Sequence, residues 1–547
     1  MKKRLFLICT LMLVLVLAFF AFVACNKTDD ELIANAGKAG IAFEIVLAIF
    51  TACAFFVVYI WLRKLYAQNN AFVNFDNTQS NEKAEPLVSV KKSGSKTAKK
   101  KANDVSFFKN TFVVLSGLLI VTVLVRLILI LTTYGVGEET TRMLTYAATL
   151  KSQGITNFVD YYSGIVTLSP GTLYILNIVG ATGLPLKSAS ILLRFVNVLG
   201  DMAVVALVYF YGKKYVGNRL STIFAGLYAV LPITMYFGGM HFAFESVLVA
   251  LMLASSIMLV EKKYLATYLL LALSVVLDVR AMLLVPIALT YMGYMFYRDN
   301  ESLKKFTLNR AKIVFGLLGF AVLVYVLTLP VAINQISAGD AFFNFKYMAN
   351  KIMYSSSFVD NSFNLYAMVG MNGKAFTNAS VKYLNLAFIC VLEIFAAYLY
   401  FKNRNRQEIL LLISFVFATT AVFTLKTDWT YIFLAIAFAL VYAMVSGEKR
   451  AYIVLGGYSF LGFLNIAQLL YKSSAFANAT NSPIVDFASK DGFLIAFSVF
   501  AVLLTGYFVY VVYSITTNGK IVDIKGLDGN LKDNLKNAFK RKPKTSK

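Results

Sequence analysis

"NTFVVLSGLLIVTVLVRLILILT", residues 110–132, is almost entirely apolar and carries one charge, Arg126. A helix needs about 20 such residues to cross a bilayer. Similar runs recur along the 547-residue chain, which is 59% hydrophobic and 15% charged, with a mean hydropathy of +0.69. Because the runs are continuously apolar and do not alternate, they favour helices over the strands of a barrel. The sequence therefore predicts an all-α polytopic membrane protein.

About fourteen membrane helices are predicted from these runs. They lie near residues 6–24, 41–62, 110–132, 189–211, 220–237, 244–260, 264–277, 281–297, 313–333, 383–401, 408–425, 430–446, 451–471 and 493–515. The chain is then divided into an N-terminal signal or anchor helix pair (1–62), a polar cytoplasmic linker (63–109), a membrane core (110–515) and a basic cytoplasmic tail (516–547). The composition of the linker and of the tail favours disorder.

The net charge of +24 is concentrated in short patches between the apolar runs. These patches are residues 2–4, 91–101, 212–219, 261–263, 297–312, 401–406, 447–450 and 536–547. An even number of predicted crossings separates each patch from the next, so all of them fall on one side. Since cytoplasmic loops carry an excess of Lys and Arg, we expect a multi-pass plasma-membrane protein with both termini in the cytoplasm. The excess of Lys and Arg is therefore explained by the orientation of the chain in the membrane, and nucleic acid is not an expected partner.

The N-terminus allows a second interpretation. "MKKRLFLICTLMLVLVLAFFAFVAC" also resembles a bacterial lipoprotein signal that is cleaved before Cys25. Cys25 would then be lipidated and the mature N-terminus would lie outside. Cys9, Cys53 and Cys390 lie in apolar segments without metal-ligand spacing, so neither a disulfide nor a metal centre is indicated. A requirement for a divalent metal stays open.

Two outer regions, 134–188 and 334–382, are long enough to build a site. In the first, Met143, Tyr146, Ala147 and Leu150 recur at helical spacing, which predicts an amphipathic helix on the membrane surface. Two carboxylates, Glu138 and Glu139, begin this helix. Read without the rest of the chain, they favour a purely structural role, because acids at a helix N-terminus complement its dipole and Arg142 lies three to four residues on.

Motifs downstream of these acids change that interpretation. The Tyr146-Ala147 pair is followed by "SPGTLY" at 169–174, by Arg194 near the start of the next helix and by "NSFNLY" at 361–366. Their order resembles the GT-C superfamily of integral-membrane glycosyltransferases, over roughly residues 110–515. The closest resemblance is to mannosyltransferases that use polyprenyl- or dolichyl-phosphate mannose and are related to the GPI-anchor pathway, including bacterial members. The fold expected is a GT-C-like core with an outer-loop amphipathic helix.

The resemblance implies a reaction and roles for several residues. A hexose, mannose by resemblance, would pass from a polyprenyl-phosphate carrier to a lipid or glycan acceptor at the outer face. Glu139 takes the position of the family's acid and would act as general base, with Glu138 as the second choice. "GGMHFAFES" replaces the family's next acidic motif and leaves His241 and Glu245 as candidates, while "KTDWTYIFL" replaces a later His-Glu-Arg motif and includes Asp428. Further site candidates are Asp160, Asn361 and Asn364.

The leaving phosphate needs a cation at the outer boundary. The candidates are Arg280, Lys426 and Arg142. The alternative for Arg280 is an ion pair with Asp278 that neutralises both groups, and Lys426 has the same alternative with Asp428.

Charged residues within apolar runs allow other classes of protein. Arg126, Arg194 and Asp201 are expected to form a buried network, because charges in a bilayer are costly unless they face a protein interior. Such a network and many helices also fit a transporter or flippase of envelope precursors. A third possibility is a protein with the GT-C fold that has lost catalysis.

Overall fold

The structure is a computed structural model of the chain. It describes residues 111–132, 137–162, 168–298, 308–340, 343, 347–348, 358–359, 361–375, 380–403, 405–425, 430–472 and 491–518. Most of these residues are helical, and they include no strand, only isolated bridges such as that between Val359 and Asn372. The predicted all-α class is confirmed for this part of the chain. The predicted helices at 6–24 and 41–62, the linker, Cys25 and most of the basic tail lie outside it.

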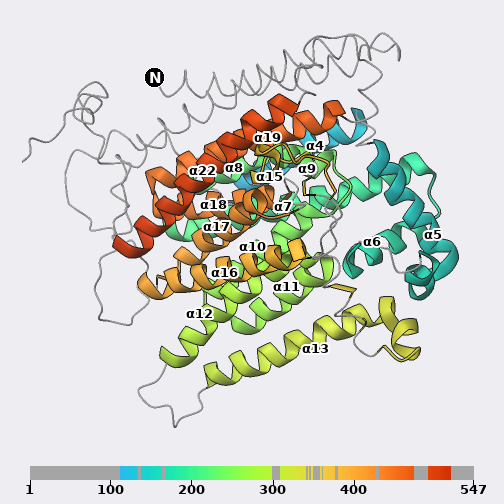
Figure 1. Cartoon of the computed structure of the whole chain (residues 1–547), viewed down its shortest axis with the longest axis horizontal. Helices are drawn as coiled ribbons and strands as arrows, with labels where there is room; N and C mark the ends of the chain where they lie inside the picture. Colours follow the sequence, from blue (N-terminus) through green and yellow to red (C-terminus); the bar gives the residue numbers. More distant parts are fainter. Residues whose placement is uncertain are drawn as a thin grey trace, which may run out of the picture.

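The helices follow one another in a bundle (Figure 1). In chain order they are α4 (Thr111–Thr132), α5 (Gly137–Tyr161), α6 (Pro170–Ala181), α7 (Leu186–Val216), α8 (Asn218–Val230), α9 (Pro232–Gly239), α10 (Glu245–Val260), α11 (Tyr264–Leu277), the 3₁₀ helix η3 (Val279–Leu283), α12 (Leu284–Arg298), α13 (Leu308–Ser337), α15 (Leu365–Met368), α16 (Ser380–Asn403), α17 (Glu408–Phe423), α18 (Thr430–Ser446), α19 (Lys449–Lys472) and α22 (Asp491–Asn518).

Each helix predicted after residue 109 overlaps one or two helices of the structure, but the number of crossings is not confirmed. Among the described residues, six spans are long and apolar enough to cross a membrane: α4, α7, η3 with α12, α13, α16 and α22. Five other apolar helices are shorter. The predicted helix at 220–237 is broken at Leu231, where α8 and α9 meet at 58° because Pro232 starts a new helix. Counting this bent pair as one span gives seven within the described part of the chain.

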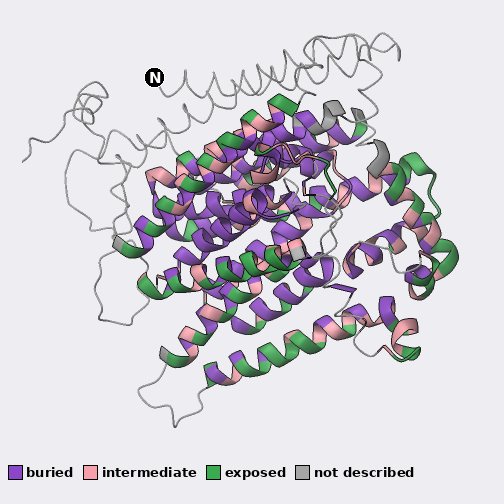
Figure 2. Cartoon of the chain, viewed as in Figure 1, coloured by how far each residue is buried: buried purple, intermediate pink, exposed green. Residues whose placement is uncertain are grey.

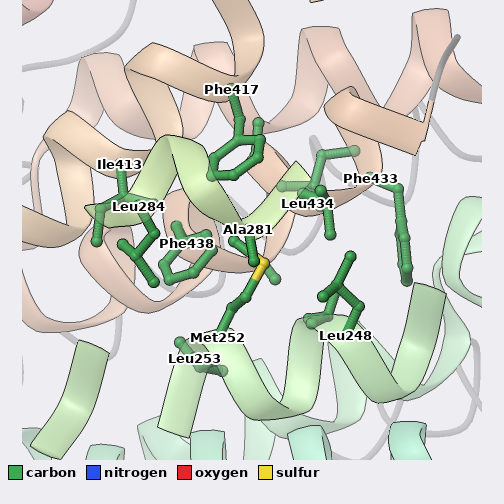
Figure 3. Packing of buried hydrophobic residues seen from close by; sticks show 14 of the residues in the cluster. Leu248, Met252, Leu253, Ala281, Leu284, Ile413, Phe417, Phe433, Leu434 and Phe438 are labelled. Atoms are coloured by element: carbon green, nitrogen blue, oxygen red, sulfur yellow. The ribbon is translucent and has the colours of Figure 1, made fainter. Parts of the chain in front are cut away.

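Helices α17 and α18 form the centre of the bundle. They have 16 and 17 residues, and nearly all of their side chains are buried. Helices that are apolar on every side are stable only when surrounded by other helices. Figure 3 shows Met252 of α10 and Ala281 of η3 packed with Phe417 of α17 and Phe438 of α18. By contrast α13 exposes apolar side chains such as Phe315 and Val322, as expected of a helix that faces lipid (Figure 2).

Basic turns gather at one end of the bundle, here called the basic end. Lys214 Nζ at the end of α7 lies 2.5 Å from Glu261 Oε1 after α10. The last turn of α7 also touches the last turn of α18, since a Cβ on Gly212 would meet Met444. The basic end includes Lys213, Lys214, Lys262, Lys263, Arg310, Arg406, Lys449 and Arg450. The structure thus agrees with the prediction that the patches within residues 212–450 share one side.

The other end is here called the distal end. It holds the turns 240–244, 278–280 and 361–375 and the C-terminus of α17. The last turns of α4 also lie there, because a Cβ on Gly239 would be 3.0 Å from Leu129 Cβ. Only residues 133–136 connect α4 to α5, so α5 begins within about 17 Å of this end.

A buried ion pair lies beneath the break between α8 and α9. Arg126 Nε of α4 is 2.5 Å from Asp201 Oδ2 of α7, and both side chains are fully buried. Arg126 also donates to Ala229 O (2.7 Å), a carbonyl next to the break, and the Tyr228 hydroxyl donates to Asp201 Oδ1 (3.0 Å). The predicted network is confirmed for Arg126 and Asp201. Arg194 instead donates to Ser190 and lies over the Phe242 ring, 5.4 Å from its centre.

The two ends generate a topological prediction. An impermeant thiol reagent should label Lys374→Cys at the distal end in intact cells, and Lys263→Cys only after permeabilisation, since the basic end should face the cytoplasm. Labelling is read as a mass shift on a gel, with the unsubstituted chain as control. Equal labelling of both variants in intact cells would contradict this orientation.

The buried pair generates a stability prediction. Asp201→Asn should lower the thermal midpoint in detergent, because losing one partner of a buried pair costs about 3–5 kcal/mol. Adding Arg126→Met should recover part of the loss, since no uncompensated charge then stays in the bundle. Additive losses in the double variant would show that the two groups are not coupled.

Candidate functional site

Polar side chains from three separate parts of the chain meet at the distal end, and this group is here called the polar cluster. It consists of His241 in the turn after α9, Glu245 at the start of α10, Asp278 and Arg280 around the start of η3, and Thr430 at the start of α18. Helices α10, α11 and α18 therefore place their ends so that charged groups share one position. Three sequence-predicted residues, His241, Glu245 and Arg280, are brought together here.

Arg280 links the two carboxylates of the polar cluster. Its Nε and Nη2 donate to the two oxygens of Asp278, each at 3.0 Å, and Nη2 also donates to Glu245 Oε1 at 3.1 Å. A further N–H donates to the Thr430 hydroxyl, and the guanidinium lies 5.9 Å from the centre of the Tyr431 ring. Asp278 also accepts from the backbone N–H of Arg280 and so caps η3. The ion pair anticipated between Arg280 and Asp278 is present.

His241 is fixed through both its ring and its backbone. Nδ1 lies 2.9 Å from Glu245 Oε2, and the ring packs edge-on against Phe237. The Asn197 amide of α7 donates to the carbonyls of His241 (3.2 Å) and Ala243 (2.7 Å). The side chain of Glu245 is 2% exposed and that of His241 is 14% exposed, so the imidazole is the more accessible member of the pair.

The "SPGTLY" segment supports the polar cluster from α6. Ser169 precedes α6, Pro170 occupies its first turn, and the Ser169 hydroxyl accepts from Val279 N (3.3 Å). Thr172 donates to Leu277 O at 3.2 Å. A Cβ on Gly171 would lie 2.6 Å from Leu277 Cα, so only glycine permits this approach of the two backbones. The segment thus positions residues 277–279, between which Asp278 lies.

Helix α5 is the predicted amphipathic helix. Met143, Ala147 and Leu150 are buried, whereas Arg142 is exposed on the other side. Gly180 of α6 brings its backbone against Ala147, and a Cβ there would lie 2.1 Å from Ala147 O. The helix is interrupted at Gly154, where φ is 74°, a break that the sequence analysis did not predict.

Both predicted catalytic acids, Glu138 and Glu139, lie in the first turn of α5, although their side chains are outside the described residues. Lys426 and Asp428 also fall outside them. The structure therefore places the backbone of Glu138 and Glu139 near the distal end. The roles of these acids, and of Lys426 and Asp428, stay predictions.

The other predicted residues have structural partners. Asp160 accepts from Asn334 Nδ2 (2.9 Å) and Gln335 Nε2 (2.5 Å), which ties α5 to α13. Asn364 caps α15 by accepting from Ala367 N, at 2.9 Å. The Asn361 side chain accepts from the Asn372 amide at 3.0 Å and holds the loop in shape.

Tyr347 connects the two outer regions that were predicted to form the site. Its hydroxyl donates to Leu168 O at 2.5 Å, immediately before the "SPGTLY" segment. Burial raises the pKa of the Tyr347 phenol above its usual range, so it stays a hydrogen-bond donor at neutral pH.

Asn197 and Thr430 were not predicted as residues of the site. Asn197 stands between Arg194 and Asp201 at spacings of three and four residues, so the polar face of α7 gave a signal for it. Thr430 gave none, because its role depends on α18 meeting η3. Across the described part of the chain, no group of three or more His, Cys, Asp or Glu residues is arranged to hold a metal ion.

No protein-family model matches the chain, and no curated protein matches its sequence.

The contact between α6 and the end of α11 generates a prediction. Gly171→Ala should lower the thermal midpoint in detergent, because overpacking between two backbones costs about 1–3 kcal/mol. Gly117→Ala in α4 is the matched control, since a Cβ there meets nothing within 4 Å. Equal midpoints for the two variants would show that the close approach of α6 is not required.

Proposed function

We propose that this membrane protein is a glycosyltransferase that moves a hexose, by resemblance mannose, from a polyprenyl-phosphate carrier to a lipid or glycan acceptor. The reaction would take place at the distal end, on the outer face of the plasma membrane. Donor and acceptor would both be anchored in lipid, so a site at a helix-bundle end is where their head groups can meet.

The polar cluster is the observation that carries this proposal. It gathers a histidine, two carboxylates and an arginine at the end of the bundle opposite the basic turns, and three of these side chains are between 11% and 14% exposed. The "SPGTLY" segment, which suggested the family, contacts the turn of Asp278 and Arg280 directly. Burying charges is costly, and ionisable groups in perturbed environments are candidates for functional sites, so this arrangement supports a site at the distal end.

The proposed chemistry needs a base for the acceptor and a positive group for the phosphate. The acceptor oxygen would attack the anomeric carbon while the bond from that carbon to the phosphate oxygen breaks. The acceptor proton would pass to Glu139, or to Glu138 as the second choice. Arg280, Arg142 and Lys426 are the proposed cations for the donor phosphate, and Arg280 is the one that the described contacts place in the polar cluster.

A transporter or flippase of envelope precursors is the second candidate. The broken helix pair α8 and α9 favours it, because transporters often place broken helices and buried charges together near mid-membrane. The break here is stabilised by Arg126, which donates to Ala229 O, so it also has a structural explanation.

Transfer of a labelled sugar tests the proposal. Membranes from cells that produce the chain should move label from radiolabelled polyprenyl-phosphate mannose to a second lipid or a glycan, and membranes without the chain should not. Glu139→Gln should reduce this transfer at least about 100-fold at unchanged protein abundance, because it removes the base. Lys151→Gln, which removes an exposed cation of the same helix, is the control and should retain activity.

Each contrary result has a separate meaning. Chain-dependent transfer that persists in Glu139→Gln would reject this residue as the base. Passage of the labelled donor across sealed vesicles without bond formation would favour the transporter and reject the glycosyltransferase.

A further inference from the structure

The carboxyl group of Glu393 lies in the middle of a membrane span. Glu393 belongs to α16, one of the helices that are long and apolar enough to cross a membrane. It stands about 20 Å along the axis from the start of α16 and about 15 Å from its end. Since the hydrocarbon layer of a bilayer is about 30 Å thick, this side chain lies near mid-membrane when α16 spans the bilayer. A charge at that depth is costly unless it is paired.

Glu393 is buried without a hydrogen-bond partner. It is 7% exposed, and neither of its carboxyl oxygens makes a hydrogen bond within the described part of the chain. Asp201, a buried carboxyl group inside α7, is by contrast bonded to Arg126 and to Tyr228. Burial therefore has different consequences for the two groups. Asp201 is compensated by its arginine, whereas an ionised Glu393 would be an unpaired charge.

Two ring contacts show which part of α17 lies beside Glu393. Phe388 of α16 packs against Phe423 of α17, with 6.2 Å between the ring centres. Further along α16, on the other side of Glu393, Phe395 packs against Phe415 at the same distance. Glu393 is therefore level with the segment of α17 between these two rings. That segment is apolar apart from two threonines, whose hydroxyl groups are neutral.

The helices packed against α16 carry their charges at their ends. These helices are α12, α17 and α22, and their charged residues are Arg298, Glu408 and Asp491, each the first or last residue of its helix. On α16 the nearest charged residue is Lys402, about 14 Å further along the axis, and it lies over the Tyr398 ring. The other titratable side chains of the four helices are neutral when protonated: Cys390, Tyr291, Tyr294, Tyr297, Tyr383, Tyr398, Tyr400, Tyr507, Tyr510 and Tyr513. None of these helices brings a compensating charge to the middle of α16.

A proton is the ligand that such a site fits. A metal ion takes several oxygen ligands, whereas one carboxyl group is enough to hold a proton. We propose that Glu393 is a proton-binding site inside the membrane, which holds its proton at neutral pH because the ionised form would be an unpaired charge in apolar surroundings. The proton binds to a carboxylate oxygen, and the resulting carboxylic acid is neutral.

This site is separate from the polar cluster, and the inference does not rest on the proposed sugar transfer. Protonatable carboxyl groups in membrane helices take part in the proton relays of pumps and transporters. A proton bound at Glu393 would therefore give the second candidate function, the transporter, a group that could couple transport to proton movement.

Glu393 lies next to the exposed side of α16, which faces away from the bundle (Figure 2). Cys390, three residues before it, is exposed, and Ile394, directly after it, is 69% exposed. Residues three apart are neighbours on a helix surface. A small apolar reagent dissolved in lipid can therefore approach the carboxyl group more easily than a charged reagent in water.

A lipid-soluble carbodiimide tests the charge state, because it reacts with carboxylic acids in apolar surroundings. The acid proton moves to a nitrogen of the carbodiimide, a carboxyl oxygen bonds to its central carbon, and the adduct keeps the mass of the whole reagent. In the full chain in lipid vesicles at pH 7, dicyclohexylcarbodiimide should modify Glu393 at least about tenfold more than Asp201, which is paired with Arg126. A water-soluble carbodiimide should leave Glu393 unmodified. Mass spectrometry of the peptides measures both reactions.

Thermal stability provides a second measurement. Glu393→Gln has the shape and the neutral charge of the protonated acid, so this variant should fold. As the pH rises from 5 to 8, the thermal midpoint of the unchanged chain in detergent should fall by at least about 2 °C relative to the variant, because unfolding then releases the proton. Glu261→Gln, which removes a carboxyl group bonded to Lys214 at the basic end, is the matched control and should produce no such shift.

Selective modification by the lipid-soluble reagent, or a midpoint difference that grows with pH, would support the inference. Equal modification of Glu393 by the two reagents would overturn it, because the carboxyl group would then be in contact with water. It would also be overturned if Glu393 stayed unmodified and the midpoint difference did not change with pH, since the folded chain would then hold no proton there.

Discussion

Charges inside an apolar helix bundle must be paired, and the arrangement of the helices at both polar networks follows from this constraint. Unpaired, such groups would cost several kcal/mol each. The pair between Arg126 and Asp201 joins α4 to α7 and contacts the backbone where α8 and α9 separate. Arg280 joins η3 to α10 through Glu245 and to α18 through Thr430. The pair of Arg126 and Asp201 is fully buried, whereas the contacts of Arg280 lie at the distal end of the bundle.

That difference in exposure separates a structural network from a candidate site. Arg126 and Asp201 have no exposed side-chain surface, so they stabilise the bundle and the broken helix. In the polar cluster His241 and Arg280 are each 14% exposed, so part of each side chain reaches the surface of the bundle. Residues of similar type in apolar segments therefore have different proposed roles because of where their helices end.

The glycines show how close contacts position the polar cluster. Gly171 lets the start of α6 reach the backbone at Leu277, and Gly200 lets α7 approach the start of α10 at Ser246 and Val247. Both contacts lie beside residues of the polar cluster, Asp278 and Glu245. A larger side chain at either glycine would displace a turn that carries one of its carboxylates. The "SPGTLY" segment thereby has a structural role that does not depend on any resemblance.

Apolar runs in the sequence predicted the helices after residue 109 other than α6 and α15, and the spacing of Met143, Ala147 and Leu150 predicted the buried face of α5. The basic patches predicted which turns share an end, because the positions of the charges and the alternating direction of successive helices can both be read from the sequence. Only the tertiary structure showed that α17 and α18 are enclosed by other helices. With 16 and 17 residues, they are also shorter than the helices that are long enough to cross a membrane. Tertiary packing also decided which residues form the polar cluster. His241, Asp278 and Thr430 are far apart in the sequence, and only the packing of α10, α11 and α18 brings them to one place.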